Sequence, residues 1–171
     1  MVEESAMEDP NEKPGLQPLR LTDLKYIDRS LAVACTRGRE AVVSRFRDIL
    51  HRENFSEQQW RVLRILVDQG EKTSAEISTL ACIHKVSISR IIASLESRGL
   101  ISRRASETDA RASYVSLTQE GRALMEPLVD EATEIHLMIA NEFGIERYEQ
   151  LLLLLRQLAE INKDSSHPIN G

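Results

Sequence analysis

Residues 85–104 of this 171-residue chain read KVSISRIIASLESRGLISRR, and this stretch decides the fold. Its first part repeats apolar residues at helical spacing on one face, while serines and an arginine occupy the opposite face. Arg98 and Gly99 supply the C-terminal signature of a helix, after which the pattern changes to a short strand-like run. The stretch therefore predicts a helix with one buried face, followed at once by a strand. The buried face is expected to contain Ile88, Ile91, Ile92 and Leu95.

Two helix starts precede this stretch. Ser56 with Gln59, and Thr73 with Glu76, have the capping-box spacing, in which each side chain bonds the backbone N–H of the other residue. The first helix is expected to stop at Gly70, because glycine tolerates the backbone conformation that ends a helix. The predicted helices cover residues 57–69 and 74–81.

The segment after Gly99 has the pattern of a β-hairpin. Residues 100–104 and 113–117 are strand-like runs on either side of a polar loop. Short helices followed by a basic hairpin are the order of a winged helix-turn-helix, whose last helix fits the major groove of DNA. An ordinary surface hairpin beside a solvated helix face is the alternative that this pattern leaves open. The candidate DNA contacts are Ser87, Ser89, Arg90 and Ser94 on the helix and Arg103, Arg104 and Arg111 on the hairpin.

The net charge of −5 argues against DNA binding until the charges are counted segment by segment along the chain. Residues 84–111 carry six basic and three acidic side chains, whereas residues 112–171 carry four basic and ten acidic ones. The acid therefore lies mainly outside the predicted DNA-binding segment, and a basic patch is compatible with the composition.

Amphipathic helices are predicted on both sides of this lobe, over residues 22–50, 118–140 and 145–163, with a break near Gly144 and a possible bend at Pro127. Their apolar residues exceed what one small lobe can cover, so we expect an obligate homodimer. Residues 1–20 are expected to be a disordered acidic leader, and residues 164–171 a flexible tail.

Other classes of protein find less support. No apolar run approaches the length of a membrane span, and the two cysteines are too few for a disulfide framework, so a protein of the cytoplasm with no membrane contact is expected. The sequence has no phosphate-binding loop, nucleophile motif or paired metal-ligand motif, since Cys82 and His84 have no second pair. We therefore expect no enzyme, no cofactor and no metal.

The chain resembles the MarR family of bacterial transcription regulators through residues 90–103 (RIIASLESRGLISR), 109–111 (DAR) and 115–121 (VSLTQEG). The resemblance implies a single domain over residues 21–163. Its DNA-binding lobe would be residues 56–117, and its dimerisation helices would lie in residues 21–55 and 118–163. It also implies that the recognition helix begins at Lys85, and that Arg111 of the wing enters the minor groove while Asp109 holds the wing loop. A plain salt bridge between Asp109 and Arg111 is the alternative.

A narrower likeness, to homoprotocatechuate-degradation repressors within that family, is carried by residues 39–41 (REA), 55–66 (FSEQQWRVLRIL) and 81–83 (ACI). It implies release of a pseudo-palindromic operator by a small aromatic, phenolic acid. Arginine side chains would bind the carboxylate, and the tryptophan would contact the aromatic ring. Tryptophan, however, is often a core residue, and arginine side chains are often solvated. The candidate ligand-binding residues are Arg37, Arg45, His51, Trp60 and Arg64.

Two other functions remain open. Some relatives sense peroxide through a cysteine in the first helix, and Cys35 lies in the corresponding predicted helix here. It is expected on the apolar stripe, about one turn beyond the sensing position, and buried cysteine is usually inert. A winged helix that binds only protein is the second alternative.

Overall fold

The computed structural model describes residues 20, 25, 27–105 and 113–161, which group into two compact units divided between Ala41 and Val42. In the first unit a turn leads into helix α1, Leu31–Val43, which extends just across the division. The Ser30 hydroxyl accepts a hydrogen bond from the backbone N–H of Val33, which is the pattern of a helix N-cap. The predicted helix start at residue 22 lies outside the described residues, and α1 begins only at Leu31 because Ser30 caps it there.

The predicted continuous helix to residue 50 is wrong in one further respect. A short 3₁₀ turn, η2 (Ser44–Phe46), separates α1 from helix α2 (Arg47–Arg52). Phe46 leaves the helical region, at φ −97° and ψ 1°, and its ring is 5% exposed in the core. One tightened turn hardly changes the phase of the apolar stripe, so the periodicity alone could not reveal it.

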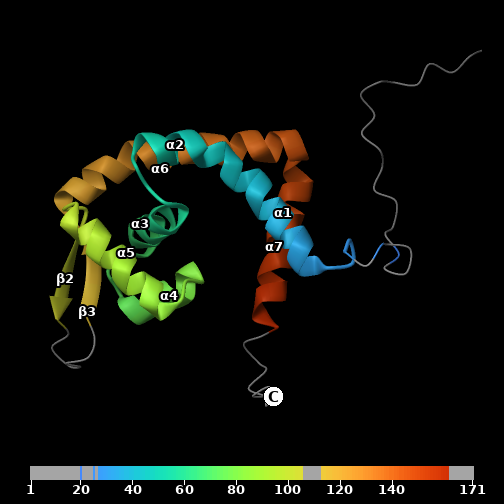
Figure 1. Cartoon of the computed structure of the whole chain (residues 1–171). Helices are drawn as coiled ribbons and strands as arrows, with labels where there is room; N and C mark the ends of the chain where they lie inside the picture. The colour runs from blue at the N-terminus through green and yellow to red at the C-terminus, as the bar shows by residue number, and fades with distance from the viewer. Residues whose placement is uncertain (1–19, 21–24, 26, 106–112, 162–171) are drawn as a thin grey trace, which may run out of the picture. The chain divides into compact units, whose positions relative to one another are not determined.

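The second unit contains the predicted lobe (Figure 1). Both capping boxes are present, with the Ser56 hydroxyl accepting from the Gln59 N–H at 3.1 Å and the Thr73 hydroxyl accepting from the Glu76 N–H at 3.2 Å. Gly70 follows the first of these helices at φ +70°, which confirms the predicted stop. The helices of the lobe are α3 (Glu57–Gln69), α4 (Ser74–Ala81) and α5 (Lys85–Ser97).

A small antiparallel sheet completes the lobe. Strands β2 (Ile101–Ala105) and β3 (Ser113–Leu117) form the predicted hairpin, with Arg103 opposite Val115. A strand that the sequence did not predict, β1 (Lys72–Thr73), pairs with the other edge of β3, so the sheet has three strands in the order β1-β3-β2. Two residues are too few to carry an alternating pattern, which is why β1 has no signal in the sequence.

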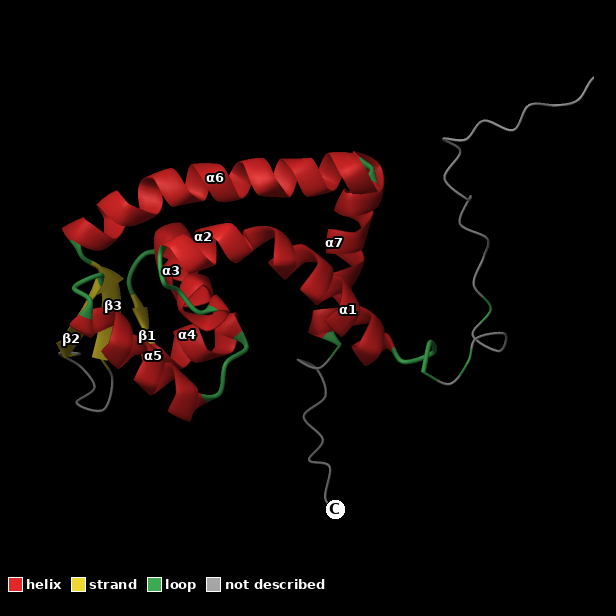
Figure 2. Cartoon of the chain, turned by 45° about the horizontal axis from the view of Figure 1, so that its top comes forward, coloured by secondary structure: helices red, strands yellow, loops and turns green. Residues whose placement is uncertain are grey.

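Two long helices follow the sheet. Helix α6 (Gln119–Phe143) runs from the end of β3 to a turn at Gly144, where φ is +99°, and α7 (Ile145–Glu160) begins there (Figure 2). The predicted break at Gly144 is confirmed, and α6 continues through Pro127. No helix among the described residues is long and apolar enough to cross a membrane.

One core joins α2 through α6, with Ile49, Leu63, Ile77 and Leu95 fully buried. The backbones of the lobe and of α6 approach each other closely at Gly121. A Cβ atom there would overlap the carbonyl oxygen of Leu100, so only glycine fits without a shift.

Candidate nucleic-acid interface and adjacent cavity

Helix α5 is positioned by burial of one face. Its isoleucines and Leu95 pack in the core, which leaves Lys85, Ser89, Arg90 and Ser94 exposed and Ser87 half-buried. The helix begins after His84, whose side chain makes no capping hydrogen bond. The Ser94 hydroxyl also accepts from the Gln59 side chain at 3.0 Å, which joins the exposed face of α5 to the start of α3. The predicted DNA contacts on this helix therefore all lie off its buried face.

Both basic residues of β2 are held by carboxylates. Arg103 donates from Nε to Oε2 of Glu96 on α5 at 2.8 Å, and this bond lowers the pKa of the Glu96 carboxyl. Arg104 donates to Glu71 at 2.9 Å, and its guanidinium lies 5.0 Å from the centre of the Tyr114 ring. Arg103 is thus fixed beside α5, whereas Arg104 is fixed beside Glu71, next to β1, and Tyr114 of β3. Asp109 and Arg111 lie outside the described residues.

Arg98, which the sequence pattern marks only as part of a helix end, also contacts residues distant in the sequence. Its two terminal nitrogens donate to the backbone oxygens of Asn54 and Glu53, at 3.0 and 2.8 Å. The guanidinium also lies 4.4 Å from the centre of the Phe55 ring. Because α2 ends at these carbonyls, Arg98 ties the end of α5 to the end of α2.

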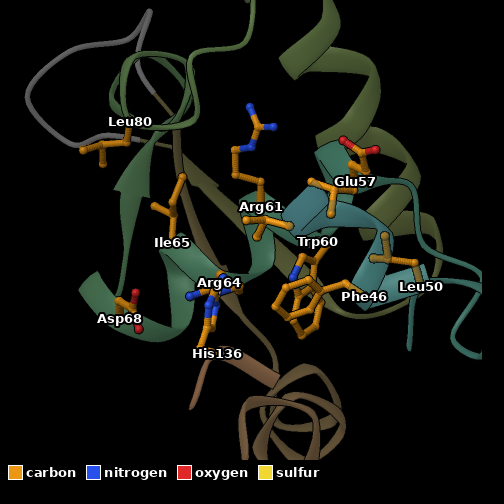
Figure 3. Close-up of a pocket in the computed structure, with 12 residues that line it drawn as sticks. Phe46, Leu50, Glu57, Trp60, Arg61, Arg64, Ile65, Asp68, Leu80 and His136 are labelled. Atoms are coloured by element: carbon orange, nitrogen blue, oxygen red, sulfur yellow. Dashed lines mark hydrogen bonds between the residues drawn. The ribbon is translucent and has the colours of Figure 1, made fainter. Parts of the chain in front are cut away.

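A cavity of about 320 Å³ opens between α2, α3 and α6, which is within the size range of small-molecule sites (Figure 3). The buried rings of Phe46 and Trp60 form one side, and the side chains of Arg61 and Arg64 supply positive charge. An aromatic wall beside an arginine suits a ligand with a ring and an anionic group. The lining residues are Val42, Val43, Phe46, Leu50, Glu57, Trp60, Arg61, Arg64, Ile65, Asp68, Leu80 and His136.

The five predicted ligand-binding residues are not brought together. Trp60 and Arg64 both line the cavity, as expected for residues four apart on one helix. Arg45 binds Glu142 at 2.6 Å, and the exposed His51 is not among the lining residues. Arg37 belongs to the first unit, where it pairs with Asp28 at 3.4 Å.

His136 of α6 is a cavity residue that the sequence did not indicate, because no motif links it to Arg64, 72 positions earlier. Its Nε2 lies 3.3 Å from Nη1 of Arg64, its Nδ1 lies 3.4 Å from the Tyr148 hydroxyl, and its ring lies 5.0 Å from that of Phe46. Burial, and then the charge of Arg64, lowers the pKa of the His136 imidazole. The imidazole is therefore neutral at neutral pH.

Cys35 is exposed, so the expected burial of this thiol on the apolar stripe is wrong for the single chain, and Cys82 is exposed as well. Within the part of the chain that the structure describes, no three His, Cys, Asp or Glu side chains gather as a metal site would require.

Comparison with known proteins places this geometry in a family. The sequence profile of the MarR family matches residues 55–113. The homoprotocatechuate degradative operon repressor of Escherichia coli is 34% identical over 142 residues, which is 83% of this chain and 96% of that protein. The chain belongs to the MarR family. It is therefore a MarR-type transcriptional repressor with a winged helix-turn-helix, and members of this family bind DNA and act as dimers.

Two further relatives extend the comparison. The transcriptional regulator FarR of Neisseria gonorrhoeae is 35% identical over 77% of this chain and 90% of its own length. The crystal structure of NadR in complex with 4-hydroxyphenylacetate is 34% identical, covers 77% of this chain and 94% of that one, and superposes with a TM-score of 0.71. A MarR-type protein of this similarity thus binds an aromatic carboxylate.

Proposed function

We propose that this MarR-type protein is a homodimeric repressor that leaves a pseudo-palindromic operator when a small phenolic acid binds in the cavity beside Trp60 and Arg64. The observation that carries the proposal is the cavity itself, in which a buried indole and a half-buried guanidinium line one space. An indole face can stack on an aromatic ring, and a guanidinium can hold a carboxylate with two parallel hydrogen bonds. NadR with 4-hydroxyphenylacetate supplies the class of ligand.

DNA would be read by the exposed face of α5 and by the wing. Arg90 is exposed on the helix, where it can reach base edges in the major groove, whereas the wing arginines would bind phosphates or enter the minor groove. Dimers of this fold place two such helices about one turn of DNA apart, hence the pseudo-palindrome. The proposed DNA contacts are Lys85, Ser87, Ser89, Arg90, Ser94, Arg103, Arg104, Asp109 and Arg111.

The dimer would form through the helices of residues 21–55 and 118–163. Helix α7 has no buried residue in the single chain, and leucines at positions 151, 155 and 158 fall on one of its faces. Apolar surface of this extent on a single chain is typical of an obligate interface. The exposed large apolar residues of α6 and α7 are Leu137, Met138, Phe143, Ile145, Leu151, Leu152, Leu153, Leu154, Leu155 and Leu158.

The cavity lies between the lobe and α6, so a ligand there can favour one spacing of the two recognition helices over another. A ligand shifts this equilibrium only by its differential affinity for the two spacings. The phenolic acid must therefore prefer dimers whose helices do not match the operator half-sites.

Operator release tests the proposal. DNA fragments bound by the protein are first selected from the host genome, and the bound sequence is then followed by fluorescence anisotropy as acid is added. We expect 4-hydroxyphenylacetate or homoprotocatechuate to release the operator from the wild type but not from Arg64→Gln, which should still bind DNA. Arg122→Gln removes a guanidinium from an exposed position of α6 outside this cavity and should respond as the wild type does. An operator complex of the wild type that persists at millimolar acid contradicts the proposal.

A further inference from the structure

The contact between Arg64 and His136 fixes where the imidazole proton lies. A guanidinium has hydrogen-bond donors only, so Nε2 of His136, 3.3 Å from Nη1 of Arg64, must be the acceptor. The single proton of the neutral ring is then on Nδ1, from which it can be donated to the Tyr148 hydroxyl 3.4 Å away. Figure 3 shows the Arg64 and His136 side chains meeting tip to tip at the cavity.

A second proton on His136 is incompatible with this contact. If Nε2 carried a proton, two donors with positive charge would face each other with no acceptor between them. A carboxylate placed at the same point changes this relationship, because its oxygens can accept from Arg64 and from a protonated Nε2 at once. A neutral imidazole would instead turn its Nε2 lone pair toward the carboxylate. The carboxylate and the proton therefore favour each other at this site.

The other groups around His136 come from η2, α3, α6 and α7. Phe46 of η2 contributes an aromatic ring, and Tyr148 of α7 contributes the hydroxyl at Nδ1. On α6 itself, Ala132 and Thr133 adjoin it in a neighbouring hollow. The charged groups that share a hollow with His136 are Glu57, Arg61, Arg64 and Asp68 of α3.

Among these charged groups Arg64 dominates. The pKa of His136 is lowered by burial and by the charge of Arg64, and Asp68 is exposed to solvent. The imidazole thus starts out neutral, and a bound carboxylate would reverse the balance of charge beside it.

We propose that His136 is a ligand-contacting residue: the carboxylate of the aromatic effector enters between Nε2 of His136 and the Arg64 guanidinium, and His136 takes up one proton from solvent in the same step. The inference rests on the effector cavity proposed above and adds to it a residue and a proton. The effector remains an anion throughout, because an ordinary carboxyl group has a pKa of about 4. Over the pH range in which the ring is neutral without ligand and charged with it, affinity should rise about tenfold for each unit that the pH falls.

Titration calorimetry of the full chain with 4-hydroxyphenylacetate tests the inference. The titration is repeated at one pH in buffers of different ionisation enthalpy, so that the change in heat counts the protons taken up. The wild type should take up a substantial fraction of one proton near neutral pH, and its Kd should rise with pH between pH 6 and 8. His136→Gln keeps a polar group near the Nε2 position but cannot be protonated, so proton uptake should vanish. His84→Gln removes an exposed histidine outside the cavity and should leave proton uptake unchanged.

The wild-type titration alone shows whether binding of the acid is coupled to proton uptake, even if a variant fails to fold. Binding without proton uptake would overturn the inference and leave the proposed effector cavity intact. Uptake that persists in a folded His136→Gln protein would overturn it too, since the proton would then go elsewhere. Failure of 4-hydroxyphenylacetate, homoprotocatechuate and salicylate to bind at millimolar concentration would overturn the effector proposal, and this inference with it.

Discussion

Arg103 of the wing donates two hydrogen bonds to Glu96 of the recognition helix. Its Nε lies 2.8 Å from Oε2 of Glu96, and its Nη2 donates to the same oxygen. Both side chains are on the side of the lobe that we assign to DNA. The pair therefore has two effects: it fixes the wing strand to α5, and it places a negative charge where DNA phosphates would approach.

Replacement of Glu96 by glutamine should separate these two effects. The variant loses the negative charge and releases Arg103 to bind a phosphate, so overall DNA affinity should increase and its dependence on salt should steepen by about one unit of log–log slope. Discrimination between operator and unrelated DNA should decrease, because the wing is less well fixed. Anisotropy titrations at four salt concentrations, with Arg103→Ala as the matched loss of the cation, give both quantities. An unchanged slope would mean that Arg103 does not reach a phosphate.

Gly121→Ala should destabilise the protein by about 1–3 kcal/mol, because the new methyl group would overlap the Leu100 carbonyl oxygen. Gly38→Ala is the matched control, since Gly38 lies inside α1 with no atom within 4 Å of the added Cβ. It should instead stabilise the protein by about 0.4–1 kcal/mol, as removal of a helix glycine usually does. Urea unfolding at one protein concentration measures both. Equal effects of the two substitutions would contradict the close approach of Gly121 and Leu100.

The lowered pKa of His136 predicts a loss of stability in acid. The unfolded chain binds a proton at this histidine as the pH falls through about 6.5, whereas the folded protein resists protonation until the pH is lower. The free energy of unfolding should thus decline as the pH falls from about 7 through the pKa of the folded state. In His136→Gln this component should be absent, whereas His84→Gln should retain it. Urea titrations at pH 7.5 and 5.5 measure the difference, and equal pH dependence in all three proteins would contradict it.

The apolar face of α7 predicts the effect of a charge at position 155. Leu155→Glu places a carboxylate among leucines that we expect in the dimer interface, so the dimer should dissociate and the protein lose much of its folded structure. Gln157→Glu adds the same charge on the polar face of the same helix and should remain a dimer. Sedimentation at micromolar concentration distinguishes them. A wild-type chain that sediments as a folded monomer would contradict the interface altogether.

The elements that could be predicted from the sequence are those fixed by local interactions. Ser56 with Gln59 and Thr73 with Glu76 encode their helix starts within four residues, and Gly70 and Gly144 encode helix ends through their backbone freedom. The turn η2 and the strand β1 could not be predicted, since each is two or three residues long and is stabilised by contacts distant in sequence.

The same distinction applies to the cavity. Trp60 and Arg64 are four residues apart on one amphipathic helix, so their common face was predictable. His136 approaches Arg64 only because α6 returns across α3, and no spacing in the sequence encodes that crossing. The ion pair of Arg45 with Glu142 likewise joins residues 97 positions apart, which is why a pattern search could not tell that Arg45 has a partner outside the cavity.

We expect one small acid and the operator to compete through a single conformational equilibrium. Calorimetric titration of 4-hydroxyphenylacetate into the free dimer and into its saturated operator complex measures this competition. Linkage requires that the operator lower the protein's affinity for the acid by the same factor by which the acid lowers its affinity for the operator. Such factors are typically about 5–150-fold. We predict that the two factors agree and that Arg64→Gln abolishes both. Equal affinity of the acid for the free dimer and for the operator complex would contradict this competition, because the ligand would then bind without acting as an inducer.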